Sequence, residues 1–62
     1  MKQSTINTLA CANRLRRFKV DDMPEQHRGG IRHLVRAGCL KRSGDEYVVT
    51  NFGEFRLKMS EP

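Results

Sequence analysis

Residues 24 to 50 restrict the fold more than any other segment, because their sequence, PEQHRGGIRHLVRAGCLKRSGDEYVVT, signals a helix, its end and a tight turn in close succession. Proline suits the first turn of a helix and is excluded from its interior, so a helix is predicted to begin at Pro24 with Asp22 as its cap. This helix is predicted to run to Ala37, because Gly38 can adopt the left-handed conformation that ends a helix.

The predicted helix over 24–37 has two chemically different faces. A ridge of guanidinium groups with a four-residue spacing is formed by Arg28, Arg32 and Arg36. The apolar face, predicted to turn inward, is formed by Ile31, Leu34, Val35 and Gly38. Gly29 and Gly30 each cost a helix about 0.5–1 kcal/mol relative to alanine, so each is expected to allow a close approach. We expect Gly29 to lie on the exposed face of the helix and Gly30 to face a neighbouring helix.

The next segment, CLKRSGDEYVVT, predicts a β-hairpin over residues 39–50 that turns at Gly44 and Asp45. A two-residue loop pairs Arg42 with Tyr47 and Leu40 with Val49. This register places Leu40, Tyr47 and Val49 on the face that covers the helices. Lys41 falls on the opposite face, and the hairpin is predicted to consist of two strands.

The ends of the chain add two further helices to this single predicted domain, residues 1–62. A first helix, capped by Ser4 or Thr5, is expected to extend to about Arg17, followed by an extended piece at 18–20 or a brief helix around 21–23. Thr50 is expected to cap a final helix over about 51–59. Its apolar residues, open to assignment as core or as a dimer patch, are Phe52, Phe55, Leu57 and Met59.

Size and charge narrow the function classes. A chain of 62 residues buries too little surface for a deep catalytic cavity, and its thin core favours a homodimer through the terminal helices. Between residues 14 and 42 there are nine Lys and Arg against three Asp and Glu, a net charge of +6 within a total of +5. The positive potential therefore belongs to the middle of the chain, where a polyanion is expected to bind.

Reactive side chains are sparse. Cys11 and Cys39 form no C-x-x-C pair and lie beside apolar residues, which predicts buried thiols in a reducing cytoplasm. The acidic cluster of Asp21, Asp22 and Glu25 is explained by capping and by the helix dipole. The sequence therefore predicts a protein that is not an enzyme, with no catalytic residue, metal, cofactor, small-molecule ligand or membrane segment.

The segment IRHLVRAGCLKRSGDEYVVTNFG, within a match over about residues 18–57, resembles the winged helix-turn-helix family of DNA-binding domains. In that family the recognition helix commonly ends with leucines three residues apart and an Ala-Gly. A leucine, a β-wing with a Gly/Asp turn, and a Thr followed three residues later by a Gly come next. The matching positions are Ile31, Leu34, Ala37, Gly38, Leu40, Gly44, Asp45, Thr50 and Gly53. The resemblance implies a small α+β domain of three helices with a two-stranded hairpin wing and a C-terminal helix.

In such domains the recognition helix enters the major groove of duplex DNA and the wing contacts phosphate or the minor groove. The resemblance thus implies a sequence-specific transcriptional regulator, similar to compact phage or mobile-element repressors. The base contacts that it implies are Gln26, Gly29, Arg32, His33 and Arg36. The phosphate contacts that it implies are Arg14, Arg16, Arg17, Arg28, Lys41 and Arg42.

Two other interpretations fit the same residues. A winged helix can act as a protein-interaction module, in which the final helix or the basic face holds an acidic partner, as a small phage-borne inhibitor would. The basic face can also bind double-stranded RNA by its shape, through phosphate and 2′-hydroxyl groups.

Overall fold

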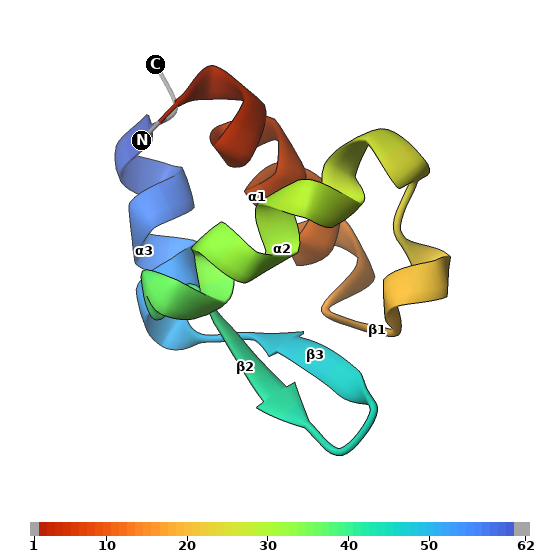
Figure 1. Ribbon diagram of the computed structural model, residues 1–62. Coiled ribbons are helices and arrows are strands. Elements are labelled where there is room, and N and C mark those ends of the chain that lie inside the picture. The colour runs from red at the N-terminus through yellow and green to blue at the C-terminus, as the bar shows by residue number, and fades with distance from the viewer. Residues whose placement is uncertain (1, 61–62) are drawn as a thin grey trace.

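The computed structural model describes residues 2–60, which form helices packed beside a small antiparallel sheet (Figure 1). The elements in chain order are α1 (Gln3–Leu15), β1 (Arg17–Phe18), the 3₁₀ helix η1 (Val20–Asp22), α2 (Glu25–Arg36), β2 (Leu40–Ser43), β3 (Glu46–Val49) and α3 (Asn51–Ser60). The α+β class predicted from the sequence is confirmed.

The helix expected over 24–37 is α2, and its boundaries follow the predicted signals closely. Pro24 stands at the N-cap, and Gly38 has a φ of 84° directly after the end of the helix. The predicted role of Asp22 is wrong, because its Oδ2 accepts a hydrogen bond from the backbone N–H of Lys19 at 3.0 Å. Asp22 thus closes η1 on itself and makes no cap for α2.

The hairpin has the predicted register, with Leu40 opposite Val49 and Arg42 opposite Tyr47. The prediction of a two-stranded sheet is incomplete, because β1 pairs with the other side of β3 and gives the strand order β1-β3-β2. Phe18 lies opposite Tyr47, and their rings stack with centroids 5.9 Å apart. The third strand fixes the base of the hairpin to the rest of the domain.

A change of backbone direction at Arg16 makes the third strand possible. The first helix, expected to reach Arg17 from a cap at Ser4 or Thr5, instead begins at Gln3 and ends at Leu15. Arg16 has a φ of 68°, an uncommon conformation for a residue with a side chain. Its carbonyl accepts a hydrogen bond from Val49 N–H at 3.2 Å, so the chain passes directly from α1 into the sheet.

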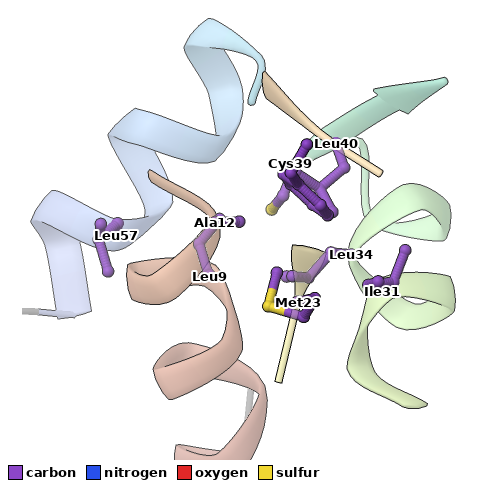
Figure 2. Close-up of a cluster of buried hydrophobic side chains, with 9 residues drawn as sticks. Leu9, Ala12, Met23, Ile31, Leu34, Cys39, Leu40 and Leu57 are labelled. Carbon is purple, nitrogen blue, oxygen red and sulfur yellow. The ribbon is translucent and has the colours of Figure 1, made fainter. Parts of the chain in front are cut away.

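The core lies between the three helices and the inner face of the sheet (Figure 2). Its buried members are Leu9, Ala12, Phe18, Met23, Ile31, Leu34, Cys39, Leu40 and Leu57. Val35, predicted to face inward with Ile31 and Leu34, is instead 37% exposed. The inward face of α2 is therefore narrower than the apolar pattern indicates.

Helix α3 packs through its smallest residue. Thr50 caps it as predicted, since Thr50 Oγ1 accepts from Gly53 N–H at 3.0 Å. The sequence left open whether its apolar residues belong to the core or to an exposed patch. Leu57 is buried in the core, whereas Phe52, Phe55 and Met59 are 48%, 57% and 70% exposed. Gly53 and Leu57 face the core, so the larger apolar side chains point outward.

Candidate nucleic-acid interface

The exposed face of α2 has two flanks, and the arginine flank faces the sheet. Spacing by four places Arg28, Arg32 and Arg36 along the side of α2 that adjoins β2 and β3. Between this ridge and the sheet lies a groove of about 370 Å³. It is lined by Val20, Arg28, Ile31, Arg32, Val35, Arg36, Arg42 and Tyr47. Four guanidinium groups thus surround a shallow surface with an apolar floor.

Two of these four arginines are held by backbone carbonyls. Arg28 donates from Nε to Met23 O at 3.0 Å and from Nη2 to Asp21 O at 3.4 Å, which fastens α2 to η1. Arg42 donates from Nε to Gly44 O at 3.0 Å across the hairpin turn. These bonds orient both side chains and leave other N–H groups of each guanidinium to bind an anion.

Arg32 and Arg36 differ from them in having no protein partner. Within residues 2–60 neither side chain makes a hydrogen bond or joins an ion pair. Both are exposed, so their charge is directed at solvent. An exposed pair of unpaired guanidinium groups on one helical ridge is suited to bidentate contacts with an acceptor-rich ligand.

The second flank of α2 adjoins the beginning of α1 and is polar. A hollow of about 360 Å³ lies here, lined by Lys2, Ser4, Thr5, Thr8, Gln26, Gly29, Gly30 and His33. The structure therefore brings Gln26, Gly29 and His33 together, as it does the arginines on the other flank. A Cβ added at Gly29 would meet nothing within 4 Å, so the backbone of α2 is open to close approach there.

The remaining predicted phosphate contacts lie away from α2. The strand register puts Arg17 and Lys41 on the outer face of the sheet, opposite the face that carries Arg42. Arg17 also approaches Glu46, with Nε 3.8 Å from Oε1. Arg14 is exposed on α1, and Arg16 pairs with Glu54 of α3. Of the six residues, only Arg28 and Arg42 share the groove with Arg32 and Arg36.

Sequence reasoning did not include Tyr47 and Val20 in the interface, although both line the arginine groove. The predicted hairpin register places Tyr47 on the face toward the helices, and this signal could have indicated that Tyr47 lies in the groove beside α2. The sequence held no such signal for Val20, because its position depends on η1.

An ion pair links η1 to the hairpin. Lys19, the cap of η1, has its Nζ 3.5 Å from Oδ2 of Asp45 in the hairpin turn.

The other reactive groups show no second site within the described range. Burial raises the pKa of the Cys39 thiol, an effect that Arg56 partly opposes, so Cys39 stays a neutral thiol at physiological pH. Over residues 2–60 no three His, Cys, Asp or Glu side chains gather as they would around a metal ion. The same residues contain no helix with the length and apolar character needed to cross a membrane.

Gly30 supports the contact between α1 and α2, as expected. A Cβ at this position would lie 2.9 Å from Thr8 Oγ1 and 3.1 Å from Thr8 Cγ2. Thr8 is buried, and its hydroxyl donates to Ser4 O at 3.0 Å while lying 3.1 Å from His27 Nδ1. A larger residue at Gly30 would therefore disturb the polar contact that joins the two helices.

We predict opposite effects on stability for alanine at the two adjacent glycines. Gly30→Ala should lower the free energy of unfolding by about 1–2 kcal/mol, because overpacking against Thr8 exceeds the gain in helix propensity. Gly29→Ala should raise it by about 0.5–1 kcal/mol, because its Cβ would meet nothing within 4 Å. Urea unfolding followed by circular dichroism measures the change in stability of each variant. Equal changes in stability at both positions would contradict this division of roles.

Comparison of the chain with models of known protein families, with curated proteins and with solved structures finds no match. The candidate interface therefore rests on the structure of this chain alone. That geometry consists of a helix with unpaired arginines on one flank, polar residues around an open glycine on the other, and a hairpin beside it.

Proposed function

We propose that this protein binds duplex DNA sequence-specifically and acts as a transcriptional regulator, with α2 in the major groove and the β2-β3 hairpin as a wing on the backbone. The observation that carries the proposal is the exposed face of α2. Along it, Arg32 and Arg36 make no side-chain hydrogen bond or ion pair with any of residues 2–60, and Gly29 leaves the helix backbone open. An α-helix fits the major groove, and arginine is the side chain that most often reads guanine there.

The groove between α2 and the sheet supports the second half of the proposal. A helix in the major groove and a hairpin at the neighbouring minor groove are separated by one sugar-phosphate strand. In this protein the space between the two elements is the groove bordered by Arg28 and Arg42. Their guanidinium groups are already oriented by backbone carbonyls, so they lose little freedom on meeting a phosphate.

The proposed division of contacts follows from these positions. Arg32 and Arg36 would donate to guanine, and Gln26 and His33 would read bases beside Gly29 on the other flank. Arg28 and Arg42 would hold the strand between helix and wing. Phosphate contacts that lie farther from α2, on the outer sheet face and at the end of α1, would come from Arg14, Arg16, Arg17 and Lys41.

Selection from a pool of random duplex DNA tests the proposal directly. The protein is titrated with the pool at two salt concentrations, and the bound fraction is recovered and sequenced. We expect one enriched motif and binding that weakens as salt increases, because contacts to phosphate release counterions. An inverted repeat in the motif would show in addition that two copies bind together.

The other outcomes separate the competing interpretations. Salt-sensitive binding without any motif would indicate a non-specific DNA-binding protein and contradict a specific regulator. Preferential binding to double-stranded RNA in the same assay would assign the basic face to RNA. No binding at low salt would reject nucleic acid and favour the protein-interaction module.

A further inference from the structure

Helix α3 presents an apolar stripe that the proposed DNA interface does not use. Phe52, Phe55 and Met59 are spaced by three and four residues, so they lie along one side of the helix. Each is about half exposed or more, whereas Gly53 and Leu57 on the opposite side are buried. Three large apolar side chains in a row on a surface helix indicate a binding surface for another molecule.

Positive charges flank this stripe on both sides. On a helical wheel Arg56 lies next to Phe52 and Met59, while Lys58 lies beyond Phe55 on the other side. Glu54 is the single acidic residue among residues 51–60, and it is paired with Arg16 of α1. Within residues 2–60 neither Arg56 nor Lys58 joins an ion pair, so the exposed side of α3 there combines apolar side chains with positive charge.

The surface continues from α3 into a hollow of about 360 Å³. Besides Arg56 of α3, its lining consists of Lys2, Thr5, Ala37 and His33, and His33 also lines the polar flank of α2. Next to Ala37, Gly38 has the ring of Phe52 close by, since a Cβ added to Gly38 would lie 3.7 Å from Phe52 Cδ2. The hollow therefore lies beside the apolar stripe of α3. Its positive charges come from Arg56, next to the stripe, and from Lys2, near the start of α1.

We infer that this surface, the α3 stripe with its adjoining hollow, docks an acidic, amphipathic segment of another protein. Apolar side chains of the segment would cover Phe52, Phe55 and Met59, and its carboxylates would meet Arg56 and Lys58. The positive charges of Arg56 and Lys58 favour this partner, because opposite charges around an apolar centre set both the position and the identity of the bound chain.

A second copy of this chain fits the surface less well. In a two-fold pair of α3 helices the same patch meets itself, so Arg56 and Lys58 would face further positive charge. The three side chains also supply on the order of 300 Å² per copy, against about 800 Å² for each side of a standard interface. The homodimer expected from the thin core would therefore need contact area beyond this stripe.

Two synthetic helical peptides test the inference by fluorescence anisotropy. Both carry the same stripe of leucines, and the flanking positions hold glutamate in one peptide and lysine in the other. We expect the acidic peptide to bind the whole protein at least about tenfold more tightly than the basic one. Phe55→Ala and, separately, Arg56→Glu should each weaken binding of the acidic peptide by about tenfold.

A variant in the other basic surface provides the matched control. The double variant Arg32→Ala with Arg36→Ala should bind the acidic peptide as the parent does, because neither residue lines the α3 surface. Since Phe55 is 57% exposed, its replacement should leave the circular dichroism spectrum unchanged. That spectrum shows that lost binding reflects lost contact.

Three results would overturn the inference. The first is equal affinity for the two peptides. The second is acidic-peptide binding that survives Phe55→Ala and Arg56→Glu but disappears in the Arg32 and Arg36 double variant, which would move the site to α2. The third is a protein dimer, seen by sedimentation, that Phe55→Glu converts to monomer, because the stripe would then be occupied by a second copy.

Discussion

Replacing Gly53 with alanine is expected to remove most of the protein's stability. A Cβ at this position would lie 2.3 Å from the backbone carbonyl oxygen of Cys39 and 3.0 Å from its carbonyl carbon. The same carbonyl accepts a hydrogen bond from Thr50 N–H at 3.0 Å, so it is fixed at the junction of α3 with the sheet. Relief requires α3 and the backbone at Cys39 to move apart, which would also expose Leu57.

The expected cost of Gly53→Ala is about 3 kcal/mol or more, above the usual range for overpacking because the clashing atom is backbone. A single core of this size rarely supplies more than about 3–5 kcal/mol, so the variant would retain little stability. Urea unfolding measured by circular dichroism checks this. Gly29→Ala is the matched control, since its Cβ meets nothing within 4 Å and it should unfold no earlier than the parent.

A cooperative unfolding transition for Gly53→Ala at the parent's midpoint would contradict the prediction. It would mean that α3 can shift away from Cys39 at little cost and that the close approach is not needed for the fold.

Replacing Arg32 with alanine is expected to reduce affinity for the selected DNA motif by about 5- to 150-fold and to alter which base is preferred at one position. The range corresponds to the 1–3 kcal/mol by which a bidentate arginine discriminates guanine from other bases. Arg32 is exposed and has no partner within residues 2–60, so its removal should leave stability unchanged. Anisotropy titrations against the motif and its single-base variants measure both effects.

Lys41→Ala is the control that separates base contacts from phosphate contacts. Lys41 lies on the outer face of the sheet, so its loss should weaken all sequences equally and lower the salt slope by about 1. If Arg32→Ala instead weakened all sequences equally, Arg32 would be a phosphate contact, and base reading would belong to Gln26 and His33. An unchanged affinity would remove α2 from the interface.

The elements with strong local signals could be predicted from the sequence. Pro24 and Gly38 bound α2, and Gly44 at a φ of 64° sets the hairpin register. Thr50 caps α3 as expected. In each case one residue type has a conformational property that few others share, so the signal survives without knowledge of tertiary contacts.

Features that depend on tertiary packing could not be predicted in the same way. Strand β1 has two residues, too few to show alternation, and it depends on the positive φ of Arg16, for which the sequence has no marker. The inward face of α3 was hidden because a glycine makes the closest contact there while Phe52 and Phe55 point outward. A pattern of hydrophobic residues predicts that the larger side chains turn inward. The short distance between α3 and the Cys39 backbone, however, leaves room only for glycine.

The candidate site shows the same limit. Helical spacing predicted the arginine ridge, and the register separated Lys41 from Arg42 on opposite faces of the sheet. Spacing alone did not indicate that Arg28 would bind the carbonyls of η1 or that Arg16 would pair with Glu54, 38 residues away. The sequence offers each exposed arginine several acidic residues as possible partners. Only the fold determines which of them comes close enough to form an ion pair.

The position of β3 in the middle of the sheet predicts an order of events during folding. β3 meets β2 across a two-residue turn, whereas it meets β1 only after a loop of about thirty residues has closed. A hairpin forms in about 1–10 μs, so β2 and β3 are expected to pair before β1 joins them. The stacking of Phe18 on Tyr47 comes with the later, slower closure, and the arginine groove is complete only when that step has brought Val20 of η1 beside the hairpin.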